Sequence, residues 1–177
     1  MIRVAKKEDA KECVRVLDLA MDEFSSAIFN TKDESNKFRL FEEFFKQENN
    51  RVSYKNVVVY ELEKHIAGAI CFYKGELSTK LDEVFNKALL KEGKEPLLKE
   101  CLDDEYYIDS VAVAPKYRGR GIFKELFKTV LKIAKESGYK KASLITKTPS
   151  LYHPFGFEEK ERSDFYGELY IKMVKTL

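Results

Sequence analysis

Residues 107–138 read YIDSVAVAPKYRGRGIFKELFKTVLKIAKESG and carry three local patterns in succession. The first seven residues are mostly β-branched or aromatic and predict a strand, which Pro115 ends because proline cannot donate to a sheet ladder. A basic turn with two glycines follows. Apolar residues at helical spacing from Ile122 onward then predict a helix, and Gly138 terminates it.

The glycine turn lies where an anion could bind. A helix begins with backbone N–H groups that have no intrahelical partner, and its dipole is positive at that end. Glycines at positions 119 and 121 leave no Cβ in front of those groups, so the amides of 118–123 are predicted to form an anion cradle. The turn alone is a weak signal, since many such turns only join a strand to a helix. It is neither a P-loop, which needs Gly-Lys-Ser/Thr, nor a dinucleotide fingerprint, whose third glycine is absent.

Composition restricts the class of protein. The chain has 177 residues, 44% of them hydrophobic and 35% charged, which predicts one globular domain over residues 1–177. The formal net charge of +2 gives no reason to expect a nucleic-acid or membrane partner. Three widely spaced cysteines lack metal-ligand spacing, so we expect free thiols, no metal site and a reducing, cytoplasmic location. No signal peptide or transmembrane run is evident.

The remaining patterns predict further strands and helices around this unit. We expect a long helix from Asp9 through Phe24, an aromatic-faced helix over 33–47, and an insertion over 76–104 that contains a helix over 80–90. Strands are predicted at 2–5, 56–62, 66–73, 141–146, 158–162 and 166–174, with 141–146 parallel to 107–113 through a right-handed crossover. In the last strand, alternation predicts Leu169, Ile171 and Met173 on the buried face and Tyr170 on the wet face.

Two segments together resemble a known family. Residues 110–122, SVAVAPKYRGRGI, resemble the acetyl-CoA-binding segment of the GNAT N-acetyltransferases, and Tyr152 to Phe157, with the pattern Tyr-x-x-x-Gly-Phe, resembles that family's late signature. The resemblance implies an α/β (α+β) fold with a mixed, mostly antiparallel twisted sheet flanked by helices. Its two central parallel strands would splay apart to admit the pantetheine arm of coenzyme A.

The resemblance also implies site residues, with acetyl-CoA as cosubstrate. The family's general acid, which protonates the departing thiolate, corresponds to Tyr152. Backbone groups of the central strand would pair with the pantetheine arm, and the amides of the turn would hold the pyrophosphate. The cofactor-binding residues implied are Val111, Ala112, Val113, Arg118, Gly119, Arg120, Gly121, Ile122 and Phe123.

The general base is assigned from position in the strand. Asp109 lies in the central strand with the same parity as Val111 and Val113, and is the candidate. It could instead be a structural carboxylate bonded to backbone amides. Glu105, just before it, is a weaker candidate.

The sequence departs from the family pattern around these residues. Phe123 stands where a third glycine is common, and Lys116 where Gln or Arg is usual. The asparagine that usually precedes the late signature is absent, the segment 146–151 is shortened, and Pro154 interrupts the expected helix.

These observations favour an acetyl-CoA-dependent N-acetyltransferase that acts on a primary amine by direct attack in a ternary complex. A CoA-binding regulatory or sensor module with little turnover is the alternative that the departures suggest. A nucleic-acid-binding domain, based on the basic stripe from Arg120 to Lys132, is disfavoured because the chain is nearly neutral. The acceptor, an amine-bearing small molecule or peptide, carries no diagnostic motif, and a homodimer is left open.

Overall fold

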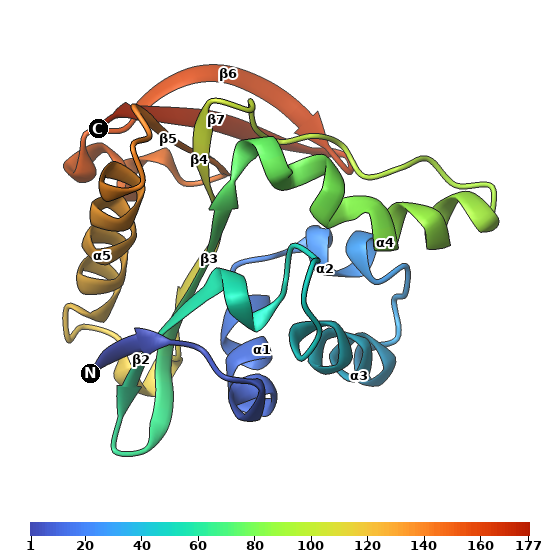
Figure 1. Ribbon diagram of the computed structural model, residues 1–177, viewed down its shortest axis with the longest axis horizontal. Coiled ribbons are helices and arrows are strands. Elements are labelled where there is room, and N and C mark those ends of the chain that lie inside the picture. Colours follow the sequence, from blue (N-terminus) through green and yellow to red (C-terminus); the bar gives the residue numbers. More distant parts are fainter.

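The computed structural model describes all 177 residues and contains seven strands with five α-helices (Figure 1). In chain order these are β1 (Ile2–Val4), α1 (Ala10–Asp18), α2 (Glu23–Ile28), α3 (Glu34–Phe45), β2 (Val57–Leu62), β3 (His65–Lys74), α4 (Ser78–Lys91), β4 (Glu105–Val113), α5 (Ile122–Glu136), β5 (Lys141–Thr146), β6 (Glu158–Phe165) and β7 (Glu168–Thr176). No helix combines the length and apolar character needed to span a bilayer.

All seven strands form one sheet with the order β1-β2-β3-β4-β5-β7-β6. The pair β4 and β5 is parallel, and every other neighbouring pair is antiparallel. The intervening α5 makes the crossover that a parallel pair requires. The predicted α/β (α+β) fold with a mostly antiparallel mixed sheet is therefore confirmed.

The two central strands pair along only part of their length. Their ladder runs from Glu105 opposite Lys141 to Tyr107 opposite Ser143, and it stops there. Beyond that point β4 continues to Val113 and β5 to Thr146 with no ladder between them. The predicted splay is present, and it leaves the facing edges of both strands without a sheet partner.

A β-bulge lies in β4 at the start of the splay. Cys71 of β3 pairs with Ser110, but the next residue, Phe72, pairs with Ile108, so Asp109 is the extra residue. A bulge shifts the alternation of side chains by one position. Asp109 therefore does not share a face with Val111, and the parity argument made from the sequence was wrong.

Helices cover both faces of the sheet (Figure 1). Helix α5 packs on one face, where its fully buried Leu126, Phe127 and Val130 belong to the same core cluster as Val111 and Val113 of β4. The opposite face carries α1, α2 and α3, with α4 packed against α3 through its buried Phe85. The predicted aromatic face of 33–47 is largely core, since Phe41 and Phe45 have no exposed surface.

Two predictions from periodicity were wrong. The helix expected from Asp9 through Phe24 is two helices, because α1 ends at Asp18 and Asp22 adopts a φ of 45°, in the left-handed region that interrupts an α-helix. In β7, Met173 is buried as predicted, but Tyr170 is buried and Leu169 is 58% exposed, the reverse of the faces expected for these two residues. Both corrections concern residues that border the site described below.

The insertion over 76–104 contains α4 and then an extended segment without a regular element from Lys94 to Glu100. The predicted helix is present and is somewhat longer than expected. Its importance for the site lies in Asp82 and Glu100, whose side chains are buried beneath β4.

Candidate active site

The turn before α5 presents unpartnered amides. Gly121 is the N-cap of α5 with a φ of 78°, and Gly119 has a φ of 76°. The backbone N–H groups from Gly119 to Phe123 donate to no group of the protein. A Cβ built on either glycine would meet no atom within 4 Å, so the space in front of these amides is open. The turn is thus able to bind an anion such as a diphosphate.

One predicted donor of this cradle is already engaged. The amide of Arg118 donates to the carbonyl of Pro115 at 3.3 Å, which closes the 3₁₀ turn Pro115–Tyr117. The side chain of Arg118 donates from Nε to the carbonyl of Val113 at 3.1 Å and ties the turn to the end of β4. The free amides therefore begin at Gly119, and Arg118 has a structural contact in addition to any contact with a ligand.

A cleft of about 480 Å³ joins this turn to the edge of β4. Its wall includes all three strand residues predicted to face the cofactor, Val111 to Val113, and Phe123 at the start of α5. The predicted cofactor residues are thus brought together around one cleft, apart from Arg120, which does not line it. The cleft fits an extended chain that ends in a phosphate group, because the open edge of β4 and the N-terminal end of α5 follow one another along it.

The cleft leads into a second cavity, of about 330 Å³, at the splay between β4 and β5. Asp109 and Ser110 line it from β4, Ile145 and Thr146 from β5, and Tyr152 from the segment after β5. The two cavities have five residues in common: Leu19, Ala20, Val111, Phe123 and Leu151. The break between α1 and α2 supplies Leu19 and Ala20, so the interrupted helix helps to form the site.

Tyr152 lies among aromatic side chains at this cavity. Its ring centroid is 5.5 Å from that of Phe127 and 6.1 Å from that of Phe123. Burial raises the pKa of Tyr152 above its ordinary value, and the neighbouring Thr146 opposes the shift. The phenol is therefore protonated at neutral pH and able to donate a proton.

The segment that carries Tyr152 has no α-helix. It folds as two 3₁₀ turns, Pro149–Leu151 and His153–Phe155, with Tyr152 between them. Gly156 ends the second turn with a φ of 81°. Pro154 is accommodated in the first positions of a turn, where its missing N–H has no cost.

Asp109 is held by a buried arginine. Arg51 donates from Nε at 3.1 Å to Oδ1 of Asp109, and its Nη2 contacts the same oxygen. The hydroxyl of Tyr73 also donates to that oxygen, at 3.3 Å. The alternative of a carboxylate bonded to backbone amides is therefore wrong, because all three contacts come from side chains. The second oxygen, Oδ2, has no hydrogen bond to the protein.

Two further carboxylates converge on Arg51. Glu100 accepts from its Nη2 at 2.7 Å, and Asp82 lies 3.5 Å from its Nη1. The other oxygen of Glu100 accepts from the hydroxyl of Tyr107. Burial raises the pKa of both Asp82 and Glu100, an effect that Arg51 opposes. Burial alone would lower the pKa of Arg51, but Asp109 and Glu100 raise it well above its ordinary value.

The other candidate base, Glu105, lies outside the cavity. Its carboxylate accepts from the hydroxyl of Ser143 at 2.8 Å and from the amide of Leu102 at 2.9 Å, and Lys172 lies 2.9 Å from it. It is 2% exposed. These contacts make Glu105 a link between β4, β5 and β7.

Sequence patterns did not identify several residues of the site. Arg51 follows α3 in a stretch without a motif, and Glu100 lies in the insertion, so no spacing relates either of them to Asp109. Ser110 and Tyr170 also line the cavity. The bulge in β4 places Ser110 there, and it has no sequence signal in this chain.

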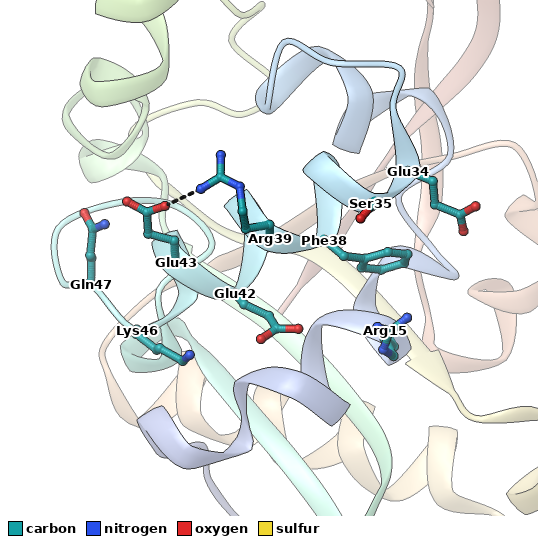
Figure 2. A pocket seen from close by; sticks show the side chains of 9 residues that line it. All are labelled: Arg15, Glu34, Ser35, Phe38, Arg39, Glu42, Glu43, Lys46 and Gln47. Atoms are coloured by element: carbon teal, nitrogen blue, oxygen red, sulfur yellow. Dashed lines mark hydrogen bonds and ion pairs between the residues drawn. The ribbon is translucent and has the colours of Figure 1, made fainter.

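A larger depression lies on the outer side of α3 (Figure 2). Its volume is about 850 Å³, but Phe38 is the only hydrophobic residue in its lining. Charged side chains dominate it, and Arg39 donates to Glu43, one turn further along α3, at 3.2 Å. Sites for small molecules are mostly apolar with a few convergent polar groups, and that description fits the cleft at the splay rather than this surface.

Solved structures with the same fold include several acetyltransferases. An N-acetyltransferase from Staphylococcus aureus Mu50 is 27% identical and has a TM-score of 0.83 over 98% of this chain and 99% of its own. Another acetyltransferase is also 27% identical, with a TM-score of 0.78 over 99% of this chain and 98% of its own. PaiA N-acetyltransferase from Thermoplasma acidophilum, solved in complex with coenzyme A, is 15% identical with a TM-score of 0.57 over 100% and 98%, which shows the fold alone.

Among proteins with a curated function, none matches this sequence. The model of the acetyltransferase (GNAT) family, however, matches residues 13–157, which include the cradle, the splayed strands and Tyr152. The free amides and the open strand edge fit the diphosphate and the extended arm of coenzyme A. The chain belongs to the GNAT family of acetyltransferases, whose acetyl donor is acetyl-CoA.

Proposed function

We propose that this protein is an N-acetyltransferase that moves the acetyl group of acetyl-CoA to a primary amine by direct attack in a ternary complex. The whole chain, residues 1–177, would act as one acetyltransferase domain. The observation that carries the proposal is that Asp109 and Tyr152 line one cavity, on different segments, at the point where β4 and β5 separate. An acid and a base on different walls of a cleft are what aminolysis of a thioester needs.

In this proposal the cofactor enters along the cleft from the glycine turn. The amides from Gly119 to Phe123 bind the diphosphate, and the unpaired edge of β4 at Val111 to Val113 binds the pantetheine arm as an added strand. The thioester then reaches the splay. A backbone N–H of β4 beside the bulge would stabilise the negative charge that develops on the carbonyl oxygen.

The two side chains divide the proton transfers. The attacking amine must be neutral, so Asp109 accepts a proton from the ammonium form through its free Oδ2 and releases it to solvent, which leaves Oδ2 an acceptor again. After attack the amine nitrogen carries a positive charge, and the same oxygen accepts its second proton. Arg51 and Tyr73 hold only Oδ1, which orients the carboxylate without covering its second oxygen. Tyr152 gives its proton to the thiolate that leaves. Positioning of the two substrates supplies much of the remaining acceleration.

The alternative is a CoA-binding regulatory or sensor module. It is favoured by one observation, the two 3₁₀ turns that replace a helix around Tyr152. A sensor would bind the cofactor through the same cradle but would not release free thiol when an amine is present.

The test is a screen of amines for release of the CoA thiol. The panel contains n-butylamine, 1,4-diaminobutane, tyramine, kanamycin, lysine and a peptide with a free N-terminus. Thermal shift with CoA and acetyl-CoA is measured in parallel. Turnover of any amine with stabilisation by CoA supports the enzyme. Stabilisation with no thiol release above the hydrolysis background would favour the sensor, and no stabilisation would contradict both.

A further inference from the structure

Ser110 has a buried hydroxyl that the protein leaves without a partner. The residue is 5% exposed, and its Oγ makes no hydrogen bond. It lines the 330 Å³ cavity together with Asp109 and Tyr152. Buried hydroxyls in folded proteins nearly always have a partner, so an exception that borders a binding cavity indicates a polar group supplied by a ligand.

The bulge brings Ser110 and Asp109 to the same face of the sheet. Ser110 lies opposite Cys71, whose side chain belongs to the core on the α1 side, so Ser110 faces that side too. Asp109 also faces it, since its carboxylate meets Arg51 and borders a small cavity lined by Met21 and Phe24. In a regular strand two consecutive residues would point to opposite faces.

Two acceptor atoms of this pair have no hydrogen-bond partner in the protein. Oδ1 of Asp109 is engaged by Arg51 and Tyr73, but its Oδ2 is not, and the side chain is 3% exposed. Ser110 adds its Oγ. A neutral primary amine has two N–H groups and one lone pair. When the two N–H groups donate to the two oxygens, the lone pair of the nitrogen stays free to attack the thioester carbonyl carbon.

The two other buried side-chain atoms without a partner lie elsewhere. They are Oδ1 of Asp18 and Oγ of Ser78, and neither residue lines the cleft or the cavity at the splay. Ser78 is 4% exposed and begins α4. It is therefore a matched control, a buried serine away from the site, whose hydroxyl lies near the thiol of Cys101.

We propose that Oδ2 of Asp109 and Oγ of Ser110 together hold the amino group of the acceptor, and that Ser110 is a positioning residue that selects primary over secondary amines. The inference rests on the proposed function, because it assigns the acceptor side of that site. A neutral secondary amine has a single N–H and satisfies only one of the two oxygens, so it is the poorer acceptor for the wild-type protein.

The experiment compares wild type with Ser110→Ala, Ser110→Cys and Ser78→Ala. The acceptor is the amine of the panel that wild type acetylates fastest, with its N-methyl derivative as the secondary amine. Loss of one hydrogen bond predicts that Ser110→Ala raises the KM for the primary amine about threefold to tenfold. The KM for acetyl-CoA stays unchanged, and the preference for the primary amine shrinks. Ser110→Cys behaves in the same way, because a thiol is a weak acceptor.

Ser78→Ala is expected to keep both KM values and the preference. Unchanged acceptor KM and preference in both Ser110 variants would overturn the inference and leave the proposed function intact. A rise confined to the KM for acetyl-CoA would also overturn it, because Ser110 would then contact the cofactor. If wild type acetylates no amine, the proposed function fails and this inference fails with it. Thermal unfolding of each variant shows whether a kinetic change reflects loss of folded protein.

Discussion

Arg51 and Asp109 are 58 positions apart in the chain, and Nε of Arg51 lies 3.1 Å from Oδ1 of Asp109 beneath the splayed strands. Both side chains are almost fully buried, at 2% and 3% exposure. The contact leaves one oxygen of Asp109 engaged and the other free toward the cavity. The proposed base is thus oriented by a residue from a segment that supplies no other part of the site.

Replacement of Arg51 by methionine is expected to destabilise the fold strongly. Three buried carboxylates, Asp82, Glu100 and Asp109, would lose their single common cation. Removal of one partner from a buried ion pair typically costs about 3–5 kcal/mol, because the remaining charge is left uncompensated. Urea denaturation measures the free energy of unfolding. The control is Arg39→Met, which breaks an exposed pair with Glu43 and should cost less than about 1 kcal/mol.

Equal losses for the two arginine variants would contradict this account of the interior. It would mean that the buried carboxylates are protonated together or solvated when Arg51 is absent.

Substitution of Gly121 by alanine tests the cradle. The residue has a φ of 78°, so alanine is strained there by about 1 kcal/mol, and its Cβ would enter the space in front of the free amides. We expect the KM for acetyl-CoA to rise about tenfold or more, since the methyl group obstructs the diphosphate. Gly138→Ala is the matched control. Its φ is 85°, it also has open space around it, and it lies at the other end of α5.

The two glycine variants should lose similar stability in thermal unfolding, while only Gly121→Ala changes the KM for acetyl-CoA. If Gly138→Ala raised that KM equally, the effect of Gly121→Ala would be a consequence of a weakened helix.

The elements with strong local signals could be predicted from the sequence. Helix α5 and strand β4 were predicted correctly because their apolar spacing, Pro115 and Gly138 all lie within a few residues of the features they determine. The resemblance to the acetyltransferases added the splay, which no local pattern contains. Asp109 was assigned to the cavity for a wrong reason, since the expected alternation ignores the bulge that turns it there.

The rest of the site depends on contacts that are distant in the chain. Arg51 and Glu100 are single charged residues in irregular segments, and their burial is decided by how the insertion packs under β4. The break at Asp22 had no glycine or proline to mark it. A non-glycine residue with a positive φ is stabilised by its tertiary surroundings, so sequence periodicity gives no indication of it.

The pKa of Asp82 predicts how stability depends on pH. Burial raises this pKa in the folded state, and the nearby Arg51 opposes the shift. A carboxyl group with a raised folded-state pKa contributes stability that is fully present below its ordinary pKa of about 3.9 and is lost as the pH rises through the folded-state value. Asp82→Asn removes this contribution, because an amide does not titrate.

As the pH rises from about 4 to 7, the free energy of unfolding of Asp82→Asn is therefore expected to increase relative to that of wild type. Urea denaturation at several pH values measures it. Asp103→Asn is the control, because its side chain is 73% exposed, and its difference from wild type should change much less with pH. If the free energy of unfolding of Asp82→Asn instead decreased relative to that of wild type over this range, the pKa of Asp82 would be lowered in the folded state.

Tyr152→Phe tests the proposed general acid. The variant keeps the ring that packs against Phe127 and removes only the proton donor. We expect kcat to fall about 100-fold or more at neutral pH, within the range for loss of general acid catalysis, and the protein to remain folded.

The pH profile gives a second readout. Burial raises the pKa of Tyr152 above about 10, so loss of the phenol proton should reduce wild-type activity at high pH, and this alkaline decline should be absent from the variant. Tyr139→Phe, which removes a hydroxyl beyond the C-terminal end of α5 and outside the cavity, should leave both kcat and the decline unchanged. A Tyr152→Phe enzyme with wild-type kcat would assign the proton to water or to another group, and the cavity would then need Tyr152 only for its shape.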